Sequence, residues 1–188
     1  MNWHLVSLLL FALSSNEFVA AEEAEMSDID KSLFDASAAE DIDAATAALK
    51  GGANINALSP RGSQTPLMQS VLHGRTKMVQ FFLENGADFT IGERNGYTPM
   101  HGAGFQGRKE VAELLFKYGV GLRDKHEDGY EPAIRACWGP QDRHTETVEW
   151  FLDNGVPVDD IYDDCMEKGS DRTKQLLESR KSSGSGEL

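Results

Sequence analysis

The chain has 188 residues, which allows one compact domain or one short repeat array and excludes two large domains. Hydrophobic residues make up 40% of the sequence and charged residues 26%, which argues against wholesale disorder. The 18 basic residues against 31 acidic ones give a net charge of -13, and a field of that sign repels phosphate backbones and argues against general nucleic-acid binding.

Residues 1–21 have the features of a secretory signal peptide. Residues 5–13 form an apolar run of about nine residues, close to a signal-peptide core and shorter than the ~20 residues of a membrane-spanning helix. Val19-Ala20-Ala21 before Glu22 supplies small residues for cleavage, although the segment contains no Lys or Arg. We therefore expect a secreted or luminal protein of the secretory pathway, with no membrane span after cleavage. The alternative is a buried or frayed N-terminal helix, which would leave the protein in the cytoplasm.

The remaining sequence repeats itself. Thr65-Pro66 recurs as Thr98-Pro99 and as Glu131-Pro132, each time after 33 residues. A second marker is a pair of apolar residues that stand four and three residues before a glycine. It occurs four times, before Gly52, Gly86, Gly119 and Gly155. Four phased copies indicate a stack of similar units, none of which can bury its hydrophobic face alone.

These residues resemble the ankyrin repeat family, which has a 33-residue period and a Thr-Pro-Leu-His signature. The best copy, residues 93–125, contains Asn95-Gly96-Tyr97-Thr98-Pro99-Met100-His101-Gly102-Ala103. The resemblance covers roughly residues 28–180. It implies an all-α ankyrin-repeat solenoid of stacked helix-turn-helix units with short hairpin loops, built from three central repeats plus two capping units. It also implies a protein that binds other proteins and is not an enzyme.

The phasing divides the chain as follows. After the signal peptide come an acidic flexible lead-in over residues 22–30 and an ankyrin repeat domain over residues 31–181. Within that domain we expect an N-terminal capping repeat at 31–57, central repeats at 58–92, 93–125 and 126–158, and C-terminal capping helices at 159–181. Residues 182–188 are expected to be a flexible tail. Both terminal units carry polar residues for an outer face, as the ends of a stack require.

Local chemistry supports a turn and two helices in each unit. Gly96 accepts the positive φ of a tight turn, and Pro99 fits the first position of a helix. Thr98 is expected to cap that helix. His101 is expected to hydrogen-bond the turn rather than to act in catalysis or metal binding. A left-handed glycine is expected to end each second helix.

Cys137 and Cys165 raise the question of a disulfide. In the repeat frame both fall at small positions between adjacent layers. Stacked helices lie about 8–10 Å apart, whereas a disulfide needs Cα atoms within about 7 Å. We therefore predict two separate buried thiols, and a bridge remains the alternative because the expected compartment is oxidising.

A contact surface is expected where the repeat frame leaves side chains free. The family uses the hairpin tips and the end of each first helix as a concave surface, and here these positions carry an aromatic stripe. An exposed aromatic column favours a binding site, because Trp and Tyr are enriched in binding hot spots; the alternative is ordinary packing between repeats. The predicted partner-binding residues are Leu72, His73, Arg94, Asn95, Tyr97, Phe105, Gln106, Glu127, Asp128, Tyr130 and Trp138.

No residue pattern indicates catalysis. His73, His101 and His144 are candidates for an acid or base, but nothing orients one against a nucleophile. The acids between Asp159 and Asp164 lack the glycine and distal glutamate of a calcium loop, so we expect no metal and no cofactor. We predict a monomeric interaction module for a protein partner, preferentially a basic one. The alternative is a structural or regulatory subunit of a luminal assembly.

Overall fold

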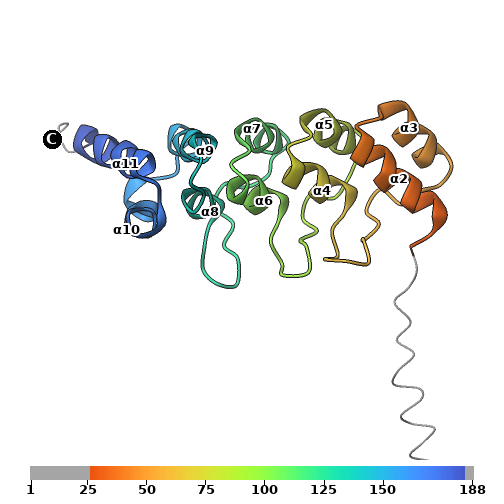
Figure 1. Ribbon diagram of the computed structural model, residues 1–188, viewed down its shortest axis with the longest axis horizontal. Coiled ribbons are helices and arrows are strands. Elements are labelled where there is room, and N and C mark those ends of the chain that lie inside the picture. Colours follow the sequence, from red (N-terminus) through yellow and green to blue (C-terminus); the bar gives the residue numbers. More distant parts are fainter. Residues whose placement is uncertain (1–25, 185–188) are drawn as a thin grey trace, which may run out of the picture.

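A computed structural model describes residues 26–184 and shows a stack of helix pairs. Ten helices within this range form five antiparallel pairs, arranged side by side in an elongated slab (Figure 1). The inner layer consists of α2 (Asp28–Ala39), α4 (Pro66–His73), α6 (Pro99–Phe105), α8 (Pro132–Cys137) and α10 (Val158–Lys168). The outer layer consists of α3 (Ile42–Lys50), α5 (Thr76–Glu84), α7 (Lys109–Lys117), α9 (Asp142–Asp153) and α11 (Asp171–Gly184). The expected all-α solenoid is confirmed.

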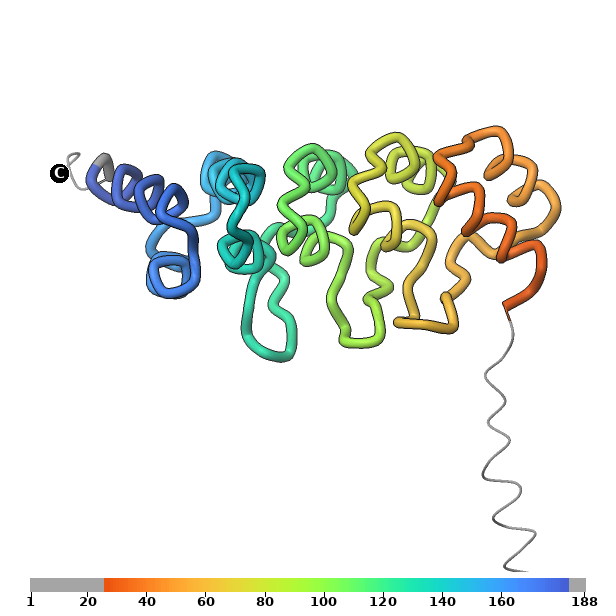
Figure 2. The backbone as a smooth tube through the Cα atoms, viewed as in Figure 1, coloured from red at the N-terminus to blue at the C-terminus, as the bar shows by residue number. Residues whose placement is uncertain are grey.

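Three hairpin loops project from the same side of the slab, one after each of α3, α5 and α7 (Figure 2). Neighbouring loops are tied together. The backbone N–H of Arg94 donates to the carbonyl of Gly62 at 2.8 Å, and that of Asp88 donates to the side chain of Asn56 at 2.9 Å. The loops are therefore held as a row beside the inner helices.

The local signals act largely as expected. Proline occupies the first turn of α4, α6 and α8, and Gly86, Gly119 and Gly155 follow the second helices with φ of 82°, 87° and 96°. Thr65 caps α4 by accepting the N–H of Met68 at 3.0 Å. Thr98 does not cap α6 with its side chain, because its hydroxyl bonds Nδ1 of His101 at 2.8 Å.

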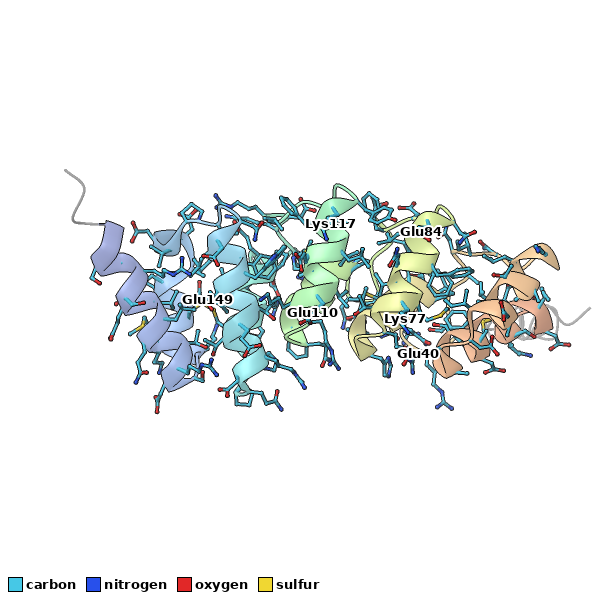
Figure 3. All side chains as sticks on the ribbon, turned by 90° about the horizontal axis from the view of Figure 1, so that it is seen from above. Glu40, Lys77, Glu84, Glu110, Lys117 and Glu149 are labelled. Carbon is cyan, nitrogen blue, oxygen red and sulfur yellow. A yellow bond between two sulfur atoms is a disulfide. The ribbon has the colours of Figure 1, made fainter. Side chains whose placement is uncertain are left out.

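One continuous core runs between the layers. Each outer helix of the central repeats contributes a pair of buried apolar side chains: Met78 with Phe82, Val111 with Leu115, and Val148 with Phe151. Their opposite face is solvated, as an amphipathic helix requires. Seen from above, it carries charges of both signs (Figure 3): Lys77, Glu84, Glu110, Lys117 and Glu149.

The helices extend beyond the predicted domain at both ends. Helix α2 begins at Asp28, inside the predicted lead-in, because Ser27 caps it by accepting the N–H of Asp30 and because acids suit a first turn. Helix α11 continues to Gly184, inside the predicted tail. The predicted signal peptide, residues 1–21, lies outside the described residues. None of the helices within residues 26–184 has the length and apolar character needed to cross a membrane.

The prediction of separate thiols is wrong, because Cys137 of α8 and Cys165 of α10 form a disulfide. Their Cα atoms lie 5.2 Å apart. The prediction compared the distance between helix axes with a limit on Cα atoms. Since Cα atoms stand about 2.3 Å from each axis, facing Cα atoms of neighbouring helices approach to roughly 5 Å. Two small side chains in facing positions are therefore within bonding range.

Candidate functional site

A buried cation organises the inner face between the second and third hairpin loops. Arg135 of α8 is only 5% exposed. The carbon of its guanidinium lies 4.6 Å from the ring centre of Tyr97, 5.0 Å from that of Tyr130 and 4.1 Å from that of Trp138. Such contacts stabilise a desolvated cation against the negative faces of the rings. We call these four residues the arginine cage.

Asp128 balances the charge of the arginine cage. Its carboxylate accepts hydrogen bonds from Nη2 of Arg135, from the hydroxyl of Tyr97 at 2.9 Å and from the N–H of Tyr130 at 3.2 Å. Desolvation would raise the pKa of Asp128, but these hydrogen bonds and one from His126 outweigh it and hold the pKa well below its ordinary value. Arg135 and Asp128 therefore form a neutral ion pair at physiological pH.

The C-terminal capping unit completes the arginine cage. Nζ of Lys168, on α10, donates to the hydroxyl of Tyr130 at 3.0 Å and lies 4.9 Å from the ring centre of Trp138. The hydrogen bond to Tyr130 raises the pKa of Lys168. Cys165 lies one turn earlier on the same helix and is bonded to Cys137, the neighbour of Trp138. The disulfide thus holds Lys168 against the rings.

A pocket of about 310 Å³ opens beside the arginine cage. Its central helix, α6, contributes Gly102, where a Cβ would lie only 3.2 Å from the side chains of Met68 and Leu72 on α4. Phe105 lies in the wall and is 49% exposed. The lining residues are Leu72, Glu93, Tyr97, His101, Gly102, Phe105, Arg135 and Trp138. The pocket is therefore mostly apolar, with a few polar groups, as ligand pockets usually are.

The predicted aromatic column divides into two parts. Tyr97, Tyr130 and Trp138 pack around Arg135, as the packing alternative expected. Leu72 and Phe105 line the pocket and lie outside the arginine cage, and Phe105 is half-exposed. Tyr97 and Trp138 belong both to the cage and to the pocket lining. The stripe therefore combines a packed cage with an open wall.

The other predicted partner-binding residues lie outside the pocket lining. His73 donates through Nδ1 to the carbonyl of Gln69, and the carbonyl of Gln106 accepts from Arg143. Two fingertip residues also make internal contacts: Arg94 donates to the carbonyl of Pro60, and the carbonyl of Asn95 accepts from His126. Glu127 is exposed on the third loop, and Asp128 serves the arginine cage.

Sequence reasoning missed four of the lining residues: Glu93, His101, Gly102 and Arg135. Arg135 gave a usable signal, since it is a charged residue in the otherwise apolar and short helix α8, close in sequence to Tyr130 and Trp138. Glu93 gave none, because an acid in a hairpin loop of an acidic chain is unremarkable.

The three histidines considered for catalysis have structural contacts. His101 is buried, accepts from Thr98 and donates through Nε2 to the carbonyl of Tyr130 at 3.3 Å, and burial lowers its pKa. His144 is buried, donates to the carbonyl of Phe105, and has a pKa lowered first by burial and then by Arg143. Across residues 26–184 no three side chains of His, Cys, Asp or Glu are grouped to hold a metal ion.

The structure is that of a repeat scaffold that presents a rigid surface. It consists of stacked helix pairs, with a row of hairpin loops on one side and a pocket on the inner helices. The family model for ankyrin repeats, in three copies, matches residues 33–126. The chain belongs to the ankyrin repeat family. Ankyrin repeats are protein-interaction modules and are generally non-catalytic.

Several curated proteins are similar to parts of the chain. Inactive serine/threonine-protein kinase TEX14 of Mus musculus is 32% identical over 103 residues, which cover 55% of this chain and 7% of that protein. Notch-regulated ankyrin repeat-containing protein A of Danio rerio is 36% identical over 73 residues, covering 37% of this chain and 64% of that protein. The human Notch-regulated ankyrin repeat-containing protein is 36% identical over 62 residues, covering 33% and 54%. The matches thus span less than two thirds of each relative.

Proposed function

We propose that the chain is a non-catalytic module that binds a segment of a protein partner on its inner face, with the pocket beside Phe105 as the anchor point. The observation that carries the proposal is the half-exposed Phe105 in the wall of a preformed, mostly apolar pocket. Tyr97 and Trp138, on the other walls, are fixed by Arg135, so little ordering entropy opposes binding. The net charge of -13 favours a basic partner through long-range attraction.

We further propose that the module acts as a monomer in the secretory pathway. The predicted signal peptide supports this location, and so does the disulfide between Cys137 and Cys165, since disulfides persist mainly in oxidising compartments. Size-exclusion chromatography with light scattering tests the monomer, and N-terminal sequencing of the protein from secreting cells tests cleavage after Ala21. A mature N-terminus at Met1 would contradict the secretory assignment.

Comparison of two exposed phenylalanines tests the binding role. Phe105 lies in the pocket, whereas Phe116 is 42% exposed on the outer helix α7 and packs edge-to-face on Trp150. The wild-type protein, Phe105→Ala and the matched control Phe116→Ala are used as bait with secretory-compartment extract, and captured proteins are quantified by mass spectrometry. We expect a set of proteins retained by wild type and Phe116→Ala and lost with Phe105→Ala. Equal capture by all three proteins would contradict the proposal.

A further inference from the structure

The pocket carries one charge that has no ion-pair partner among residues 26–184. Its titratable lining groups are Glu93, Tyr97, His101 and Arg135, and desolvation raises the pKa of Tyr97 above its ordinary value, so its hydroxyl is uncharged. Arg135 is paired with Asp128, and His101 is neutral at physiological pH because burial lowers its pKa. Glu93 accepts a hydrogen bond from the amide of Gln64 at 2.9 Å, but within residues 26–184 it has no ion pair. The pocket and its counter-ion therefore carry a net negative charge.

The cation next to Glu93 in the sequence does not pair with it. Arg94 follows Glu93 in the sequence, yet its guanidinium donates to the carbonyl of Pro60 at 3.4 Å, on the preceding hairpin loop. Arg94 is also absent from the pocket lining. The carboxylate of Glu93 is thus left as an acceptor at the pocket for a donor from outside.

One aromatic ring of the pocket is also free. The ring of Tyr97 stacks on His126 with ring centres 3.8 Å apart and also contacts the guanidinium of Arg135. Trp138 contacts Arg135 and Lys168. Phe105 makes no ring or cation contact with any other described residue and is half-exposed. Its π face is therefore available to a cation supplied by a partner.

The pocket thus combines an apolar wall, a free ring and a terminal carboxylate. A side chain with an apolar stem and a cationic head satisfies all three, because the stem covers Leu72 and Phe105 while the head reaches Glu93. The volume of about 310 Å³ is at the lower end for ligand pockets and suits a single side chain. A carboxylate occupant would instead be repelled by Glu93.

We propose that this pocket is a receptor for one arginine or lysine side chain of the partner segment, held between the ring of Phe105 and the carboxylate of Glu93. The inference rests on the proposed function and adds the chemistry of the anchor residue. Lysine presents a point charge, whereas arginine presents a planar group that stacks on the ring and bonds the carboxylate with two N–H groups. Arginine is therefore expected to bind more tightly than lysine.

A phage library of random 12-residue peptides, selected on the full-length protein, provides the probe. Enriched peptides are synthesised and their affinities measured for wild type, Glu93→Gln, Phe105→Ala and the control Glu113→Gln. Glutamine at position 93 keeps the amide-oxygen acceptor for Gln64 and removes the charge. Glu113 is exposed on the outer helix α7, so its variant makes the same change of net charge away from the pocket. Circular dichroism melting checks that each variant is folded.

We expect the enriched peptides to share an arginine or lysine whose replacement by norleucine weakens binding about 10-fold or more. Glu93→Gln should cause a similar loss and remove the difference between the basic peptide and its norleucine form, while Glu113→Gln keeps both. Two results would overturn the inference and leave the proposed function standing. The enriched peptides could lose affinity with Phe105→Ala but contain no basic anchor, or they could lose affinity with Phe105→Ala but bind Glu93→Gln as well as wild type. Absence of enriched peptides, or peptides insensitive to Phe105→Ala, would count against both.

Discussion

Removal of the disulfide should lower stability by a predictable amount. Cys137 and Cys165 are 28 residues apart in the sequence, and both are fully buried. In the chain-entropy description, closing a loop of that length in the unfolded state stabilises the folded protein by about 3.5 kcal/mol. For a chain of this size the loss corresponds to roughly 10 °C in melting temperature. We expect the wild-type protein treated with a dithiol reductant to unfold at correspondingly lower urea concentration.

Comparison of three states isolates the covalent bond from packing. Oxidised and reduced wild type keep the same side chains, so their difference reports the cross-link, and Cys137→Ala/Cys165→Ala adds the loss of two buried sulfur atoms. Because each unit of a stack contacts mainly its neighbours, reduction should increase hydrogen exchange in α10 and α11 and spare α4 and α5. Equal urea midpoints for the oxidised and reduced protein would show that the cross-link does not stabilise the fold. Free thiols at both positions in the unreduced protein, detected by mass spectrometry, would show that the disulfide does not form.

Further variants probe the pocket wall and the arginine cage by urea unfolding and pH titration. Phe105→Ala should change the free energy of unfolding by less than about 0.5 kcal/mol. Trp138→Ala should lower the free energy of unfolding by about 2 kcal/mol or more, because it removes a half-buried ring that contacts the guanidinium of Arg135. Equal losses for the two variants would contradict the distinction between the pocket wall and the arginine cage. Arg135→Met should cost about 2–3 kcal/mol by leaving Asp128 unpaired, and adding Asp128→Asn should restore part of that loss; an additive double variant would show that the pair is not coupled. The pKa of Asp128 is lower in the folded protein than in the unfolded chain, where it has its ordinary value of 3.8. Its contribution to the free energy of unfolding is therefore fully present above pH 3.8 and is lost as the pH falls below that value. Asp128→Asn should therefore flatten the acid limb of the stability curve, and an unchanged limb would contradict this.

The sequence allowed the stack to be predicted because each unit repeats local signals whose physics is local. A proline at a helix start and a glycine with positive φ at a helix end act within a few residues, so their phasing transfers directly into structure. The start of α2 was missed because Asp28 and Asp30 suit both a solvated segment and a capped first turn. Composition alone does not separate these two states.

The arginine cage and the disulfide depend on contacts between residues far apart in the sequence, and their prediction required distances. Tyr97 and Arg135 are 38 residues apart, and Cys137 and Cys165 are 28 apart. The aromatic residues were found from the repeat frame, but the frame assigns positions to faces and does not say which face of a ring is occupied. Trp138 both packs against Arg135 and lines the pocket, and neither contact followed from the repeat frame, in which Arg135 was not singled out.

The arginine cage gives the proposed anchor pocket its specificity as well as its rigidity. Arg135 and Lys168 occupy faces of Tyr97, Tyr130 and Trp138 that a partner cation would otherwise contact. Lys168 donates to Tyr130 and is ion-paired with Asp164, on the helix that the disulfide joins to α8. We therefore expect external cations at the remaining ring, Phe105, and at the carboxylate of Glu93. Reduction of the disulfide should expose ring faces of the arginine cage to partner cations. Phe105 and Glu93 lie in a repeat that the disulfide does not join, so their contacts with a peptide should persist. We therefore expect reduction to increase the range of peptides bound more than it lowers the affinity for the selected peptides.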